Sequence, residues 1–170
     1  MEFTYKPIGI IHSPHKKAEG TPIQTGGAEG VEARLELLPE YREGLTDLEG
    51  FSHIILLYHC HKAGETKLMR KPFMDEKEHG IFAIRAPSRP NPIGLSVVRL
   101  VSIRDHILTI KDVDILDGTP VLDIKPYVPE FDVKEVTRVG WLEDNVHKME
   151  HKKDDGRFVH KKGNEDDKIR

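Results

Sequence analysis

The sequence predicts a mainly β protein, in which a single antiparallel sheet forms a barrel-like domain with few short helices. Apolar and charged residues alternate at 31–37, a pattern typical of a strand with one buried and one wet face. Branched and apolar residues form further short runs, and no long helical pattern separates them. Strands in succession without long helices favour an antiparallel barrel or sandwich over a doubly wound sheet.

The remaining strands follow in order along the chain. The run 51–60 is rich in branched and apolar residues and is predicted to be a central strand. Further strands are predicted at 80–84, 95–103 and 106–113, and weaker ones at 121–124 and 136–141. The link Arg104-Asp105 is short enough to join two of these strands as a hairpin, although neither residue is glycine.

Helix signals are short. Residues 39–44 are predicted to form one turn that ends at Gly44, and 46–49 a second turn. From Glu143 onward more than half of the residues are charged, so this segment has little apolar surface to offset its ordering entropy. We therefore expect a folded domain over 1–142 and a charged, flexible C-terminal tail over 143–170.

Charge, cysteine content and the length of the apolar runs limit the partners and the compartment that we expect for the protein. The net charge of −3 excludes an overall basic field for holding nucleic acid, although local patches such as Lys16-Lys17 remain. Cys60 is the only cysteine, so no intrachain disulfide forms, which fits a cytoplasmic location. The longest apolar run, at 54–58, is too short to span a bilayer, so no membrane partner is expected.

A proline-rich loop is the densest motif. Its three prolines, Pro87, Pro90 and Pro92, remove backbone donors and push the preceding residues into extended conformations. The loop carries Arg85 and Arg89, and a guanidinium is suited to gripping a carboxylate or a phosphate. The alternative is a structural turn whose arginines pair with nearby acids.

An acidic stretch, 112–120, contains a second group of candidate residues. Asp112 and Asp114 share one face if the strand persists, and the following Asp-Gly-Thr-Pro is a turn signal. Their carboxylates are suited to accepting ribose hydroxyls, facing an ammonium group or acting as a base. Turn-capping aspartates are the equally weighted alternative.

Three histidines suggest a competing chemistry. His53, His59 and His61 fall on one face of a strand, and an H-x-H pair occurs in metal sites of small β-barrels. No carboxylate near them in the sequence completes a ligand set, so hydrogen-bonded structural histidines are the favoured interpretation and no metal is expected.

Together these segments resemble the TsaA-like (YaeB/TrmO) family, whose members are regarded as tRNA methyltransferases acting on N6-threonylcarbamoyladenosine at position 37. The matches run in order through most of the domain, and the last two are the most specific. They are 7–15, Gly50-Phe51-Ser52-His53, 80–85, Arg89-Pro90-Asn91-Pro92-Ile93-Gly94-Leu95 and 116–127, the last reading D-G-T-P-V-L-D-I-K-P-Y after Leu116.

The resemblance implies a homodimeric β-barrel that binds S-adenosylmethionine and the anticodon loop of tRNA. His15 departs from the family, because bacterial members carry an aromatic residue there. Longer members also carry an extra C-terminal domain, where this sequence has only the charged tail. By resemblance, the cofactor contacts are Ser13, Pro14, His15, His61, Lys62, Arg85, Leu95, Lys111, Asp112, Val113 and Asp114.

Methyl transfer to a nitrogen requires alignment of the reactants and removal of a proton. Asp114 and His15 are the candidate groups for taking that proton, and Arg85 for holding a carboxylate of cofactor or substrate. Arg89, Lys16 and Lys17 are candidates for anticodon-loop phosphates. Two alternatives remain: a module that binds S-adenosylmethionine as a sensor without catalysis, and a cupin-like metalloenzyme using His53, His59 and His61.

Overall fold

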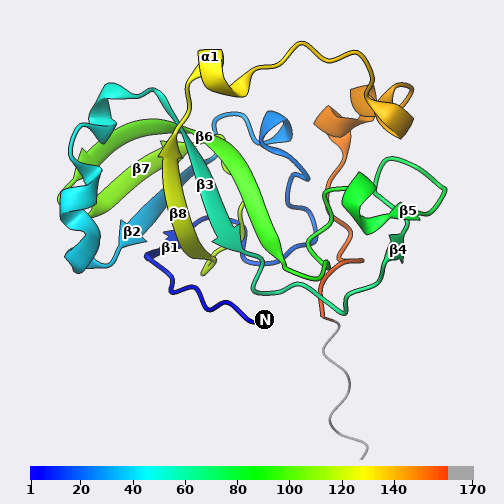
Figure 1. Ribbon diagram of the computed structural model, residues 1–170, viewed down its shortest axis with the longest axis horizontal. Helices are drawn as coiled ribbons and strands as arrows, with labels where there is room; N and C mark the ends of the chain where they lie inside the picture. Colours follow the sequence, from blue (N-terminus) through cyan, green and yellow to red (C-terminus); the bar gives the residue numbers. More distant parts are fainter. Residues whose placement is uncertain (161–170) are drawn as a thin grey trace, which may run out of the picture.

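The computed structural model describes residues 1–160 and contains a closed, antiparallel barrel of six strands (Figure 1), which confirms the predicted fold class. Around the barrel the strand order is β1-β2-β7-β6-β3-β8, and β1 pairs with β8 to close it. The strands are β1 (Gly9–His12), β2 (Glu32–Leu37), β3 (His53–His59), β6 (Ile93–Arg104), β7 (Ile107–Lys111) and β8 (Pro120–Pro126).

Apolar residues that alternate with polar ones along the strands form the core inside the barrel. In β2, Ala33, Leu35 and Leu37 are buried and the charged residues between them are exposed, as the sequence pattern predicts. Leu35 lies opposite Leu108 of β7, and Ala33 opposite Ile110, so apolar side chains meet in register. The same core includes Ile11, Leu45, Ile54, Leu56, Val98, Val113, Ile115 and Val121.

Short 3-10 helices and one hairpin complete the barrel. The predicted turns at 39–44 and 46–49 correspond to η2 (Pro39–Leu45) and η3 (Leu48–Gly50). Arg104 pairs with Ile107, so the loop joining β6 to β7 is Asp105-His106, one residue later than predicted. Asp105 adopts a left-handed φ of 57°, a conformation that aspartate tolerates better than most residues.

Two predicted strands are wrong. At 80–84 only Gly80 is in a strand, because β5 (His79–Gly80) pairs with β4 (Met69–Arg70) and then gives way to η4 (Ile81–Ala83). Ile81 begins the 3-10 helix and Ile84 follows its end in an extended conformation, and both side chains are buried in one cluster. At 136–141 the chain forms no strand and ends in η5 (Gly140–Leu142), with exposed apolar residues before it.

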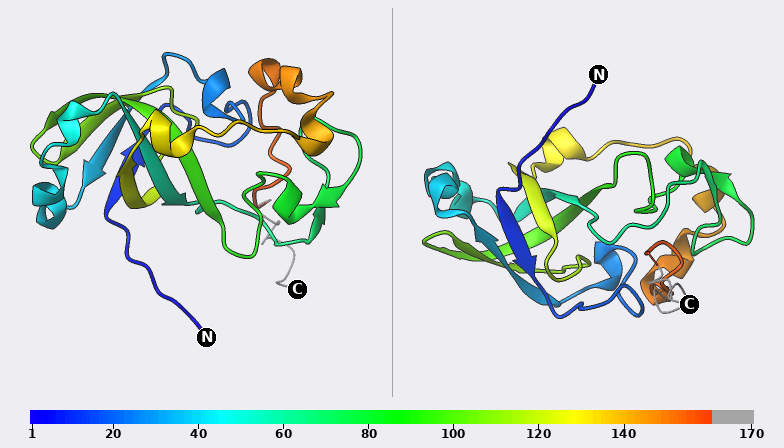
Figure 2. Two further views of the ribbon diagram at one scale, coloured as in Figure 1. Left: turned by 45° about the horizontal axis from the view of Figure 1, so that its top comes forward. Right: turned by 90° about the horizontal axis from the view of Figure 1, so that it is seen from below.

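A second layer lies beside the barrel. The views in Figure 2 show β4, β5 and η4 next to the orange C-terminal segment that carries η6 (Val146–His151). Ile81, Ile84, Ala86 and Phe158 form its small core, against which Phe73 and Trp141 pack. The other short elements are η1 (Thr25–Gly27) and α1 (Pro129–Asp132). No helix within residues 1–160 combines the length and the apolar character needed to cross a membrane.

The C-terminal segment is more involved in packing than its composition suggests. The sequence predicts a solvated tail from residue 143, yet Phe158 is only 3% exposed. Its ring meets that of Phe73 edge-on at 4.9 Å between centroids, which gives this charged segment an apolar anchor. The division of the chain at residue 142 stays a prediction, and residues 161–170 lie outside the described part.

Candidate functional site

A cavity of about 330 Å³ lies where the end of the barrel meets the second layer. It is lined by sequence-predicted residues from both: Asp114 and Leu95 from the barrel side, and Arg85, Arg89, His61 and Lys62 from the loops. The proline-rich loop and the aspartate-bearing strand end therefore share one cavity. Its volume falls within the range of small-molecule binding sites.

The proline-rich loop is attached to the end of β3. The amide of Cys60 donates to the carbonyl of Pro92 at 2.7 Å, and Arg89 donates through its amide to Pro87 within the loop. Because the prolines have no amide hydrogen, these few bonds define the loop conformation. The loop thereby holds both of its arginines at the cavity.

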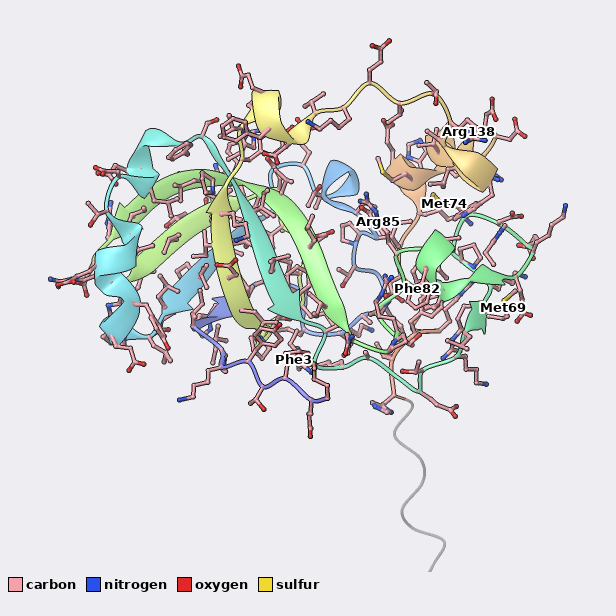
Figure 3. All side chains as sticks on the ribbon, in the orientation of Figure 1. Phe3, Met69, Met74, Phe82, Arg85 and Arg138 are labelled. Carbon is pink, nitrogen blue, oxygen red and sulfur yellow. The ribbon has the colours of Figure 1, made fainter. Side chains whose placement is uncertain are left out.

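The guanidinium groups of the two arginines contact neutral oxygen atoms. Within residues 1–160, neither Arg85 nor Arg89 forms an ion pair with a carboxylate. Arg85 Nη1 donates to Gln24 Oε1 at 3.4 Å, and Arg89 Nη1 to the carbonyl of Ile84 at 3.4 Å. Figure 3 shows Arg85 beside the blue loop that precedes β2. This arrangement disfavours the alternative of a turn whose arginines pair with nearby acids.

A chain of hydroxyls leads to the buried carboxylate of Asp114. Ser96 Oγ donates to Asp114 Oδ1 at 2.7 Å, and the Tyr58 hydroxyl lies 3.0 Å from Ser96 Oγ. Tyr58 and Asp114 line the cavity, whereas Ser96 is buried behind them. Gly94 makes room for this arrangement, since a Cβ there would lie 2.1 Å from Cε2 of Tyr58.

Burial governs the acidity of these groups. Loss of hydration raises the pKa of Asp114, while the hydrogen bond from Ser96 and the nearby His15 oppose that rise. A carboxylate with a raised pKa is a stronger base, as a proton acceptor requires. Burial also raises the pKa of the Cys60 thiol to about 11, so this cavity-lining group stays protonated and is a poor nucleophile near neutral pH.

Hydrogen bonds join the loop that follows β1, residues 13–17, to the segment that follows β7. Ser13 Oγ donates to the carbonyl of Ile115 at 2.7 Å, and the Ser13 amide donates to Asp117 Oδ1 at 3.0 Å. His15 Nε2 lies 2.9 Å from the carbonyl of Val113. Since a carbonyl only accepts, we assign the proton of His15 to Nε2. None of Ser13, Pro14, His15, Lys16 and Lys17 lines the cavity.

The lysines of the first loop have acidic neighbours. Lys16 Nζ pairs with Asp117 at 2.9 Å, and this contact is the main reason that the pKa of Asp117 is lowered. Lys17 lies 3.8 Å from Glu19. Both side chains are largely exposed, so these pairs hold them only weakly.

Of the predicted run 111–114, only Asp114 lines the cavity. Lys111 faces Glu32 at 3.8 Å, and Val113 is fully buried in the barrel core. Asp112 has a φ of 64°, accepts a hydrogen bond from the Gly30 amide at 2.8 Å and pairs with Arg99 at 3.2 Å. The left-handed residue breaks the strand alternation, so Asp112 and Asp114 do not act together.

The histidines do not gather around a metal position. Within the described chain, no group of three or more histidine, cysteine or acidic side chains is placed to hold a metal ion. His53 bonds Ser52 through Nδ1 at 3.0 Å, and His59 is exposed. His61 lies 3.3 Å from Thr119 Oγ1, and burial lowers its pKa.

Several residues of the site were not predicted from the sequence. Tyr58 and Cys60 belong to the predicted central strand, and Ser96 to another strand, where polar residues at buried positions were the only available signal. Asp154 comes from the segment predicted to be a tail and Gln24 from a segment without a predicted element, and only tertiary packing brings them to the cavity.

Sequence comparison identifies relatives of this chain. The family described as the tRNA-methyltransferase O N-terminal domain matches residues 10–133. A probable S-adenosyl-L-methionine-binding protein of Pyrococcus abyssi is 62% identical over 154 residues, which is 91% of this chain and 84% of that protein. The tRNA (adenine(37)-N6)-methyltransferase of Escherichia coli K12 is 37% identical over 137 residues, 75% of this chain and 58% of that protein.

Solved structures show the same relationship. The crystal structure of TrmO from Pseudomonas aeruginosa superposes with a TM-score of 0.70 at 40% identity, covering 83% of this chain and 63% of that one. This chain therefore spans less than two thirds of the length of the Escherichia coli and Pseudomonas proteins. The family match at residues 10–133 includes all six strands of the barrel except Gly9 at the start of β1.

Proposed function

Because this chain belongs to the tRNA-methyltransferase O N-terminal domain family, we propose that it is an S-adenosylmethionine-dependent tRNA methyltransferase. The observation that carries the proposal is that Arg85, with no acidic partner in residues 1–160, and the buried Asp114 line the same cavity. One group is suited to holding a carboxylate and the other to accepting a proton.

The cavity fits the chemistry of S-adenosylmethionine. Its volume of about 330 Å³ suits a nucleoside-sized ligand, and its wall combines charged groups with apolar ones. Leu95 is 57% exposed although it belongs to a barrel strand, and it lines the cavity, where an adenine ring would cover it. Arg85 is the proposed contact for the carboxylate, and its position in the cavity lining together with His61 and Lys62 supports this role. When bound, the cofactor supplies an electrophilic methyl group on a sulfonium sulfur.

Asp114 is the proposed proton acceptor. The attacking nitrogen of the substrate must lose a proton, and Asp114 is a carboxylate with a raised pKa that lines the cavity on the barrel side. Ser96 holds one of its oxygens, which orients the group. His15 is the weaker candidate, because its Nε2 already donates to the carbonyl of Val113 and the residue does not line the cavity.

We propose that the acceptor is N6 of threonylcarbamoyladenosine at position 37 of tRNA, in the anticodon loop. The Escherichia coli relative is named for methylation of N6 at adenine 37. Arg89 at the cavity and the exposed Lys16 and Lys17 are the proposed phosphate contacts. We further propose a homodimer, acting in the cytoplasm.

Mass spectrometry of tRNA nucleosides after incubation with the protein and cofactor tests the reaction and the acceptor together. We expect one added methyl on the threonylcarbamoyl form of adenosine and none on tRNA that lacks that modification. A methyl group on unmodified adenosine would support the proposed methyltransferase activity and refute threonylcarbamoyladenosine as the acceptor.

A binding module without catalysis is the second candidate, since the Pyrococcus relative is named only as a binding protein. Transfer of a tritiated methyl group from cofactor to total tRNA separates the two. Binding of the cofactor with no label in tRNA would favour the sensor.

A further inference from the structure

The C-terminal segment forms part of the cavity wall. Asp154 and Val159 line the cavity, although both lie beyond residues 10–133, to which the family match is confined. Two isolated antiparallel bridges hold the segment against the rest of the protein, Pro22 with Lys153 and Ala63 with Val159. Residues 153–159 are therefore a structural component of the site, not only a solvated extension.

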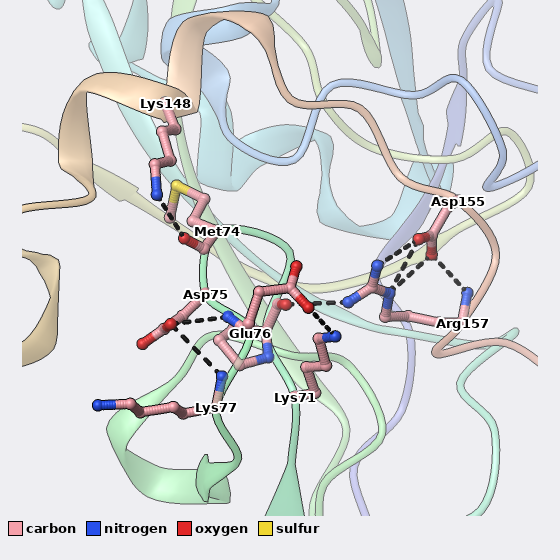
Figure 4. Close-up of polar contacts among 9 residues, drawn as sticks. Lys71, Met74, Asp75, Glu76, Lys77, Lys148, Asp155 and Arg157 are labelled. Carbon is pink, nitrogen blue, oxygen red and sulfur yellow. Dashed lines mark hydrogen bonds and ion pairs between the residues drawn. The ribbon is translucent and has the colours of Figure 1, made fainter.

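Side chains anchor this segment to the second layer. Phe158 is buried against Phe73, and the carbonyl of Phe158 accepts from the Gly64 amide at 2.8 Å. Arg157 Nη1 donates to the carbonyl of Pro72 at 2.9 Å, and its guanidinium lies 5.1 Å from the centre of the Phe73 ring. Figure 4 shows Arg157 also bound to Asp155. These contacts fix the backbone that follows Asp154.

The carboxylate of Asp154 is held in place by its own turn. Its Oδ1 accepts from the Gly156 amide at 2.7 Å, and Gly156 has a φ of 82° that glycine adopts without strain. The backbone of Asp154 makes two further bonds, to the carbonyl of Thr21 and from the amide of Gly20, each 2.8 Å. Burial raises the pKa of this carboxylate, which shows that it is partly removed from water.

The same loop positions a group of opposite charge. Residues 20–24 contact Asp154 through Gly20 and Thr21, and they contact Arg85 through Gln24. Thr21, Pro22 and Gln24 also line the cavity. Asp154 and Arg85 thus both line the cavity and both contact the same short loop.

We propose that Asp154 binds the ammonium group, and Arg85 the carboxylate, at the amino-acid end of S-adenosylmethionine. This proposal rests on the proposed function. An α-amino acid carries both charges on a single carbon, which a neighbouring acid and base complement together. Asp114 then remains for the reacting end, on the barrel side, where it bonds Ser96, which in turn bonds Tyr58.

Calorimetry on the full chain tests the proposal with three ligands: S-adenosylmethionine, S-adenosylhomocysteine and 5′-methylthioadenosine, which lacks the amino-acid end. We expect Asp154→Asn to weaken the first two by ~10- to 100-fold, the effect of losing a hydrogen bond to a charged group, and to leave the third unchanged. Asparagine keeps an oxygen for the Gly156 amide, so the turn is preserved. Glu150→Gln, an exposed change of equal charge on the same segment, is the matched control.

The ratio of affinities for S-adenosylhomocysteine and 5′-methylthioadenosine is the deciding quantity, because a partly unfolded variant lowers both equally. A ratio that falls supports the proposal. An equal loss of affinity for all three ligands would show that Asp154 has only a structural role. A loss of affinity for S-adenosylmethionine alone would show that Asp154 interacts with the sulfonium and not with the ammonium group. No change would remove it from the site, and wild-type protein that binds none of the three would refute the proposed function as well.

Discussion

Ser96 Oγ donates a 2.7 Å hydrogen bond to Asp114 Oδ1, which couples the first part of β6 to the segment that follows β7. The two residues are held by different parts of the barrel, and Tyr58 on β3 extends the contact. A buried carboxylate whose orientation depends on a neighbouring strand has both its geometry and its pKa set by tertiary structure.

Replacing Asp114 by asparagine tests its role as proton acceptor. Asparagine is similar in shape but cannot take the proton, so we expect the methylation rate to fall by ~10²- to 10⁴-fold. Cofactor affinity should stay near that of the wild type. Single-turnover methylation and calorimetry measure the two quantities, with Asp123→Asn on β8 as the control for charge. A full rate for Asp114→Asn would refute the assignment.

Replacing Ser96 by alanine should move the pH dependence of the rate. The Ser96 hydrogen bond stabilises the ionised form of Asp114 and so lowers its pKa, against the rise that burial causes. Without that bond the pKa of Asp114 rises further, and the rate must reach its plateau at higher pH. A pH profile of kcat measures the shift of the acidic limb, and a limb that moves to lower pH contradicts the coupling.

Gly94→Ala should disturb the same network through crowding. The added Cβ would lie 2.1 Å from Cε2 of Tyr58, so the ring must move and its contact with Ser96 is lost. We expect a loss of ~1–3 kcal/mol in the free energy of unfolding, as overpacking typically causes. Denaturant titration measures it. Gly80→Ala, with nothing within 4 Å of the new Cβ, is the control and should be close to neutral.

Arg85→Ala should weaken cofactor binding. Loss of a charged hydrogen-bond donor is expected to reduce affinity by ~10- to 100-fold. Arg104→Ala removes the same charge from an exposed position at the far end of β6 and should leave affinity unchanged. Calorimetry on both variants checks this prediction, and equal affinities would move Arg85 out of the cofactor site.

Phe158→Ala should loosen the C-terminal segment without unfolding the barrel. The ring belongs to the small second core and not to the barrel core, so its loss is local. We expect the amide of Gly64, which donates to the Phe158 carbonyl, to exchange faster with solvent, while amides of β2 and β7 keep their protection. Hydrogen exchange measures both, and Val146→Ala at an exposed position is the control. Equal loss of protection throughout would show that the two layers unfold together.

Much of the barrel was predictable because its strands carry local signals. Alternation in β2 and the branched run in β3 identify buried faces without reference to any other part of the chain. The strand predicted at 80–84 is wrong because a 3-10 helix occupies Ile81–Ala83, and a short apolar run does not distinguish such a helix from a strand.

By itself, the sequence determined the fold class, the stiff loop that carries Arg85 and Arg89, and the resemblance to one family, since these depend on residues close together in the chain. Tertiary structure alone decided that Asp114, and not Asp112, lines the cavity, because the left-handed Asp112 breaks the strand alternation. It also decided that Asp154 reaches the cavity. The buried Phe158 and two isolated bridges to distant residues hold that segment in place, and no local pattern in a charged stretch reveals such long-range contacts.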